Sequence, residues 1–206
     1  MTVSAFDRRV RTAAEHKKTR RKNGASRCQG DGSLDTQREW IGDKGTAMIE
    51  LIRFDLQKID EWDDFYDLFS SYLREVCDEE EYQENIDDLH NDELNAHMIE
   101  QTLQEHNPYF MMRIVENEVC VGLITYSFRE ECNKGYINNF YVCAAYRNSG
   151  VGSAVYRMVE KHLRSLGATY IELVPVRMAE RFYIRNGFAF SRTSSDGERI
   201  FRKVIE

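Results

Sequence analysis

Residues 142–153 read VCAAYRNSGVGS, and this stretch decides how the chain is organised. It stands between a strand pattern over residues 135–142 and an amphipathic helix predicted over residues 150–166. Gly150 and Gly152 let the backbone approach a ligand closely, because neither residue carries a Cβ atom. The first N–H groups of a helix have no partner inside it, and the helix dipole favours an anion there. The stretch therefore predicts a phosphate or pyrophosphate site at a helix start.

Better-known phosphate loops do not fit these residues. The stretch lacks the Lys-Ser/Thr ending of a P-loop and the GxGxxG spacing of a dinucleotide fold. An ordinary strand-to-helix turn remains the alternative, since glycine is a common turn residue.

The elements predicted around this stretch form one α+β (mixed α/β) domain, which we place at residues 48–206. Strands are expected over residues 49–54, 109–115, 119–128, 135–142 and 170–174, with two more within 188–204. Helices are expected over residues 58–76, 79–105 with a break near Asn91, 150–166 and 178–186. Gly167 is the expected stop of the third of these helices.

Residues 1–47 differ from the rest of the chain in charge and pattern. They carry 11 Lys or Arg against 6 Asp or Glu, whereas residues 48–206 carry 17 against 29. Apolar residues are sparse there, so we expect a basic extension that is disordered or loosely ordered. A nucleic-acid-binding arm is the alternative, but the acidic body disfavours nucleic acid as a partner.

Several function classes are excluded or disfavoured by missing patterns. The histidines and the five cysteines show no zinc-binding spacing, so no metal is expected. A serine-hydrolase GxSxG elbow is missing. There is no apolar run long enough for a membrane span and no secretory leader pattern, so we expect a cytoplasmic protein with no membrane partner.

Two motifs together resemble the GNAT superfamily of N-acetyltransferases. The first is Arg147-x-x-Gly150-x-Gly152 after a strand that ends in Phe-Tyr-Val, and the second is AERFYIRNGF at residues 179–188. The resemblance covers about residues 48–206 and includes the order of elements. It implies a single domain with a central mixed, largely antiparallel sheet flanked by helices. It also implies acetyl-coenzyme A as the co-substrate.

The resemblance assigns roles to individual residues. Strand residues would hold the pantetheine arm through their backbone, and these are Phe140, Tyr141 and Val142. Loop residues would cradle the pyrophosphate, and these are Arg147, Asn148, Ser149, Gly150, Val151 and Gly152. A backbone N–H near Val142 would polarise the thioester carbonyl. Tyr183 would give a proton to the departing thiolate, because a phenol stays protonated at neutral pH.

Two departures from the family pattern bear on the chemistry. Asn138 and Asn139 stand where many members carry a carboxylate that serves as general base, and an amide cannot take a proton at neutral pH. Water or a carboxylate elsewhere, such as Glu172, would have to serve instead. Val176 replaces an asparagine that contacts the pantetheine in many members.

The acceptor is expected to be a small-molecule or peptide amine. Residues 58–106 contain 17 Asp or Glu against only Lys58 and Arg74. Such a wall would favour a cationic acceptor, such as a polyamine, an amino sugar or a basic peptide. It is equally typical of a solvated helix face.

Two further possibilities stay open. The chain is expected either to catalyse transfer or, as the alternative, to be a non-catalytic coenzyme A-binding regulatory or interaction protein. Its edge strands also allow a homodimer paired through them.

Overall fold

The computed structural model describes residues 36–41 and 47–205. Strand β1 (Thr36–Ile41) pairs antiparallel with β2 (Ala47–Arg53), so the sheet includes part of the segment that the sequence pattern assigned to an extension. The rest of that segment, with its basic run, lies outside the described residues.

One sheet of eight strands forms the centre of the fold, in the order β1-β2-β3-β4-β5-β6-β8-β7. The remaining strands are β3 (Tyr109–Glu116), β4 (Val119–Arg129), β5 (Lys134–Val142), β6 (Tyr170–Leu173), β7 (Ala189–Thr193) and β8 (Arg199–Val204). All neighbours are antiparallel except β5 and β6. The predicted mixed, largely antiparallel sheet is confirmed.

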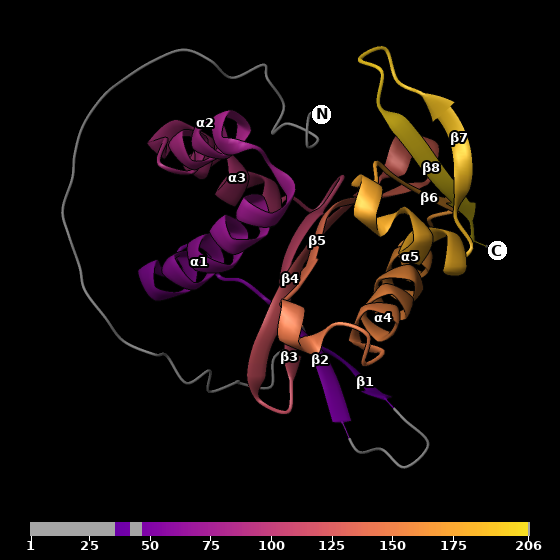
Figure 1. Ribbon diagram of the computed structural model, residues 1–206, viewed down its shortest axis with the longest axis horizontal. Helices are drawn as coiled ribbons and strands as arrows, with labels where there is room; N and C mark the ends of the chain where they lie inside the picture. The colour runs from indigo at the N-terminus through magenta and orange to yellow at the C-terminus, as the bar shows by residue number, and fades with distance from the viewer. Residues whose placement is uncertain (1–35, 42–46, 206) are drawn as a thin grey trace.

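Helices cover both faces of the sheet (Figure 1). One face carries α1 (Ile59–Val76), α2 (Glu79–Leu89) and α3 (Asp92–Leu103), and the other carries α4 (Val151–Ser165) and α5 (Glu180–Arg185). Short 3₁₀ turns form at η1 (Glu130–Cys132), η2 (Ala144–Tyr146) and η3 (Arg177–Ala179). In the part of the chain that the structure describes, no helix is both long and apolar enough to cross a bilayer.

The break predicted near Asn91 is present and has a local cause. The Asn91 side chain accepts hydrogen bonds from the N–H groups of Glu93 and Leu94, and so caps α3. The Asp78 carboxylate caps α2 in the same way, through the N–H of Glu81. Such caps satisfy N–H groups that have no partner within the helix, which fixes where each helix begins.

The sheet separates two apolar cores. Val155 and Val159 of α4 pack on one face, and Phe65 and Phe69 of α1 pack on the other. Helical spacing brings these residues onto one side of each helix, as the sequence pattern indicated.

Strands β5 and β6 separate beyond their first few residues. Their pairing runs only from Lys134 with Tyr170 to Ile137 with Leu173. On its other side β5 pairs with β4 as far as Val142, with a register shift that leaves Asn138 unmatched. The edge of β5 that faces β6 is therefore open over residues 138–142.

Candidate functional site

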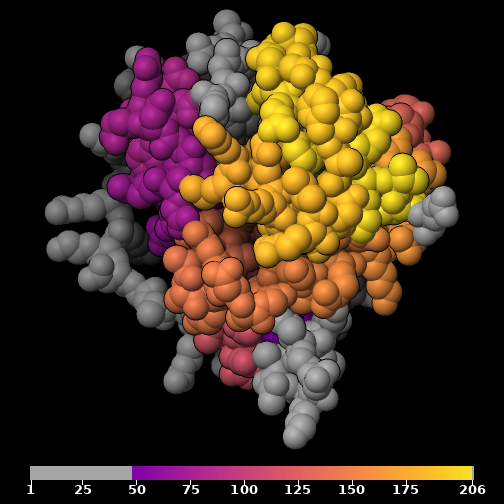
Figure 2. Space-filling model, turned by 45° about the vertical axis from the view of Figure 1, so that its right-hand side comes forward, coloured from indigo at the N-terminus to yellow at the C-terminus, as the bar shows by residue number. Residues whose placement is uncertain are grey.

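A cavity of about 670 Å³ opens beside the free edge of β5. Its walls are the C-terminal end of α1, the loop before α4, the start of α4, and the segment leading into α5. Figure 2 shows the surface hollowed where the purple of the first helices meets the orange and yellow of the C-terminal half. The volume lies within the range of small-molecule sites, which is roughly 300–1,000 Å³.

The cavity brings together most of the residues predicted for the site. Its lining includes Phe140, Tyr141, Val142, Arg147, Asn148, Gly150, Gly152 and Tyr183. Val151 does not line it, because this first residue of α4 is fully buried in the core. Ser149 does not line it either, and its hydroxyl donates to the carbonyl of Tyr146 at 2.7 Å.

The free edge of β5 presents backbone groups to the cavity. The N–H of Cys143 donates to the carbonyl of Val121 at 2.8 Å and so faces β4. Successive residues of a strand direct their backbone groups to opposite sides, so the N–H groups of Val142 and Phe140 face away from β4. These two amides are available to an extended ligand lying along β5.

The loop before α4 and the first turn of α4 line the same cavity. Gly150 has φ 98°, a left-handed conformation that glycine adopts without steric cost. It also serves as the N-cap of α4 without contributing a side chain. The first hydrogen bond within the helix runs from Ala154 N–H to the Gly150 carbonyl at 3.0 Å, so the N–H groups before Ala154 have no partner inside the helix. This is the arrangement that binds phosphates.

Gly152 lies close to two aromatic rings. A Cβ atom at this position would lie 3.3 Å from the ring of Phe182 and 3.9 Å from that of Phe140. These two rings meet edge to face across the cavity wall, with centroids 5.7 Å apart. A larger residue at Gly152 would therefore press on Phe182.

Arg147, Glu75 and Tyr141 form a polar cluster in the cavity. The Arg147 guanidinium donates to Glu75 Oε2 at 2.6 Å and to the Val142 carbonyl at 2.7 Å. The Tyr141 hydroxyl donates to Glu75 Oε1 at 3.0 Å. Burial, and then the bond to Glu75, raise the pKa of Tyr141 to about 12. Arg147 thus contributes its side chain as well as the backbone position expected for it.

Tyr183 lies on α5 and is 7% exposed. Its ring packs edge to face on Phe182 and Phe188, with centroids 5.1 and 5.6 Å away. Burial, and to a smaller extent nearby Tyr72, raise the pKa of this phenol above its ordinary value. Because raising the pKa favours the protonated form, Tyr183 keeps its proton at neutral pH.

Neither asparagine on β5 can act as a base in this geometry. The Asn139 amide donates to the Thr125 hydroxyl at 2.9 Å and is buried. The Asn138 side-chain oxygen is buried and finds no hydrogen-bond donor among the described residues.

Glu172, the carboxylate considered as an alternative base, lies elsewhere. It does not line the cavity, and Arg192 and Arg202 hold it on β6. Burial would raise the pKa of Glu172, but these guanidinium groups outweigh burial and keep the pKa below its ordinary value. Glu172 therefore holds neighbouring strands together and is not positioned to take a proton in the cavity.

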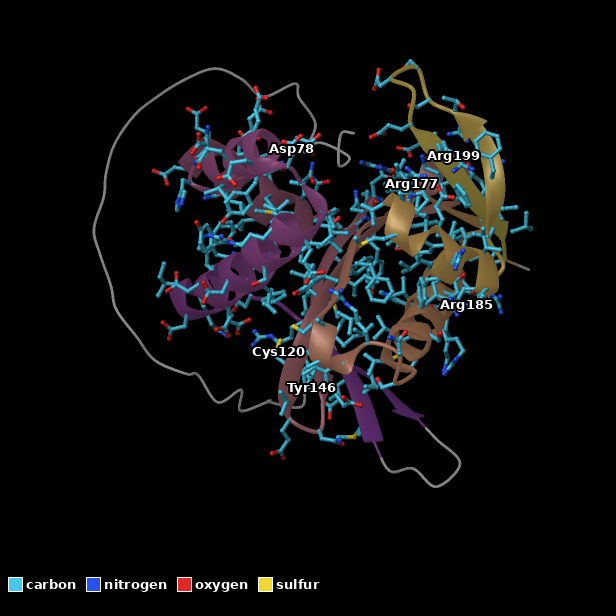
Figure 3. All side chains as sticks on the ribbon, viewed as in Figure 1. Asp78, Cys120, Tyr146, Arg177, Arg185 and Arg199 are labelled. Carbon is cyan, nitrogen blue, oxygen red and sulfur yellow. The ribbon has the colours of Figure 1, made fainter. Side chains whose placement is uncertain are left out.

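Several lining residues were missed by the sequence analysis. Tyr72, Glu75 and Val76 come from α1, and Arg181 and Arg185 come from α5. Figure 3 labels Arg185 on α5. Glu75 stands among many acidic neighbours in the sequence, so no pattern distinguished it. Helices α2 and α3 contribute no residue to the lining, and Glu75 is the one acidic residue of the described segment 58–106 that lines the cavity.

A model of the acetyltransferase (GNAT) family matches residues 62–188. Comparison with curated protein sequences gives no match. Among solved structures, PaiA N-acetyltransferase from Thermoplasma acidophilum in complex with coenzyme A has a TM-score of 0.61 and 16% identity, over 76% of this chain and 99% of its own.

Two further solved structures share the fold at similar identity. A GNAT-family acetyltransferase from Staphylococcus aureus Mu50 has a TM-score of 0.57 and 16% identity, over 77% of this chain and 99% of its own. An aminoglycoside 6′-N-acetyltransferase complexed with coenzyme A has a TM-score of 0.53 and 15% identity, over 76% and 97%.

Proposed function

The chain belongs to the acetyltransferase (GNAT) family, and from this premise we propose that it moves an acetyl group from acetyl-coenzyme A to a primary amine. The amine would attack the thioester directly, without an acetylated enzyme. The observation that carries the proposal is the cavity itself. It joins the free edge of β5, the start of α4, where no side chain caps the helix, and Tyr183 in one space.

The lining residues fit coenzyme A part by part. The N–H groups at the start of α4 suit the pyrophosphate, since they combine unpaired donors with the positive end of the helix dipole. The backbone of Phe140 and Val142 suits the amides of the pantetheine arm, because it offers strand-like hydrogen bonds. Arg147, Arg181 and Arg185 add positive charge for the phosphates.

The reaction needs two contributions from the chain, one at the carbonyl oxygen and one at the sulfur. Acetyl-coenzyme A supplies a thioester whose carbonyl carbon the amine nitrogen attacks. A backbone N–H of β5 near Val142 stabilises the negative charge on the carbonyl oxygen. Tyr183 supplies a proton to the sulfur as the carbon–sulfur bond breaks, and the proton that the attacking nitrogen loses restores the phenol. The ammonium form of the acceptor must first lose a proton, and we assign that step to water.

We propose that the acceptor is cationic. Helices α1, α2 and α3 are rich in Asp and Glu, and α1 forms one wall of the cavity. An acidic surface beside a cleft raises the local concentration of cations and steers them inward.

Incubating the protein with acetyl-coenzyme A and a panel of amines tests the function. We expect mass spectrometry to show acetylated amine and free thiol released in equal amounts. Cationic acceptors should react faster than neutral ones, and the advantage should shrink as salt screens the acidic wall.

A panel without any acetylated product would favour the alternative of a non-catalytic coenzyme A-binding protein. Rates that ignore both salt and acceptor charge would overturn the cationic acceptor while leaving the transfer reaction in place.

A further inference from the structure

Among the described residues that line the cavity, only Glu75 carries a carboxylate. It lies in the last turn of α1, and its side chain is 33% exposed. An acidic group at this place is unusual, because the same cavity is lined by Arg147, Arg181 and Arg185 and is expected to receive an anionic co-substrate. Binding of the anionic co-substrate therefore does not explain why Glu75 is present in the cavity.

Glu75 lies beside the end of β5, because its carboxylate accepts a hydrogen bond from Tyr141, the neighbour of Val142. Tyr72 precedes it by one helical turn, and residues three apart on a helix are neighbours on its surface. The Tyr72 ring packs against the Tyr141 ring with centroids 5.9 Å apart. Glu75, Tyr141 and Tyr72 thus form one continuous group of side chains, and Tyr183 lines the same cavity.

The partners of Glu75 divide between its two oxygens. Tyr141 donates to Oε1, and Arg147 donates to Oε2. Arg147 belongs to the loop that suits the pyrophosphate, and a guanidinium binds phosphate as readily as carboxylate. Phosphate groups at the loop would compete for Arg147 and leave Oε2 with an unmatched negative charge.

We propose that Glu75 then binds a second positive charge on the acceptor, and this inference rests on the proposed function. The reacting nitrogen cannot be the partner, because it must lose its charge before it attacks the thioester. A carboxylate selects for a charge that persists through the reaction, such as the distal ammonium of a diamine. Glu75 is thus a specificity-determining residue for acceptors with two cationic groups.

The order of binding follows from the same charges. Without its co-substrate the cavity lining has more cations than anions, which disfavours a dicationic acceptor. With the phosphates bound, the balance reverses and Glu75 becomes available. We expect the acceptor to bind measurably only when coenzyme A or acetyl-coenzyme A is present.

The test compares 1,4-diaminobutane with n-butylamine, which has the same carbon chain and only one amine. For the wild-type protein we expect kcat/KM to favour the diamine by about tenfold or more, the size of one charge-assisted hydrogen bond. Glu75→Gln should bring the ratio close to parity, and Glu75→Asp should restore part of it. The control Glu79→Gln, on α2 and outside the cavity, should keep the wild-type ratio.

Each outcome separates this inference from the proposed function. A Glu75→Gln variant that keeps the wild-type ratio would overturn the role of Glu75 while acetyl transfer stands. The same conclusion follows if the wild-type protein acetylates both amines equally well. If it acetylates neither while other amines of the panel react, the inference fails and acetyl transfer stands. If no amine of the panel reacts, although the protein is folded by circular dichroism, the proposed function fails and the inference fails with it.

Discussion

Replacing Tyr183 by phenylalanine should lower kcat by about 100-fold or more, because general acid catalysis contributes roughly 10²–10⁴ to a rate. The substitution removes only the hydroxyl and keeps the ring that packs on Phe182 and Phe188. We therefore expect the melting temperature and the affinity for acetyl-coenzyme A to change little. Steady-state kinetics with a saturating amine measures the effect.

The pH profile adds a second readout for Tyr183. Burial holds the pKa of this phenol above its ordinary value of about 10, so the acid stays protonated throughout the neutral and mildly basic range. The rate of the wild-type protein should accordingly not fall between about pH 7 and 9.5 through loss of this proton. Tyr66→Phe, on α1 outside the cavity, is the matched control. A Tyr183→Phe variant with the wild-type kcat would remove the phenol from the mechanism.

Glu172→Gln should destabilise the fold by about 2 kcal/mol, the cost of losing charge-assisted hydrogen bonds to a buried carboxylate whose arginine partners are partly exposed. The Glu172 side chain is 2% exposed and bonds Arg202 at 2.6 and 2.9 Å and Arg192 at 3.1 Å. Lys134 lies 3.9 Å from the same carboxylate. This one group therefore connects β5, β6, β7 and β8. Urea denaturation of the two proteins gives the difference in unfolding free energy.

The pH dependence of stability has a definite sign. The pKa of Glu172 is depressed in the folded state, so its contribution is present above the unfolded pKa of about 4.3 and is lost as pH falls through the folded pKa. The wild-type protein should lose this stability in acid. The unfolding free energy of Glu172→Gln should lack the pH dependence that Glu172 contributes. Glu180→Gln breaks an exposed pair with Arg199 and should cost less than about 1 kcal/mol. Equal losses of unfolding free energy in both variants would show that the ion pairs of Glu172 stabilise the fold no more than the pair of Glu180 with Arg199.

Much of the fold follows from local patterns in the sequence. The turn between the strands predicted over residues 109–115 and 119–128, the break at Asn91 and the helix stop at Gly167 are all present, and the strands and helices between them agree closely with the prediction. The loop at Arg147–Gly152 was also predictable, because glycines directly before an amphipathic helix let the backbone approach an anion at the helix start. These features depend on residues close together in the chain.

Features that depend on distant contacts were not predictable. Strand β1 lies in a segment with few apolar residues, and its pairing with β2 rather than its own pattern makes it a strand. Glu75 is one carboxylate among many until α1 packs beside β5. The sequence offered Glu172 as one candidate base beside water, and only the register of β6 with β8 brings Arg202 opposite it. Tertiary pairing decides each of these cases.

The central claim is that acetyl-coenzyme A binds at the loop and start of α4, and thermal unfolding tests it most directly. The variant Ser153→Glu places a carboxylate in the first turn of α4, where the helix dipole favours it but a pyrophosphate would be repelled. Ser153→Gln is the uncharged control of the same size. At 100 times its dissociation constant a ligand adds about 2.7 kcal/mol, or roughly 5–10 °C for a chain of this length.

We predict this upward shift for the wild-type protein and for Ser153→Gln, and little or none for Ser153→Glu. The contradicting result would be no shift in the wild-type protein at millimolar acetyl-coenzyme A, or an equal shift in Ser153→Glu.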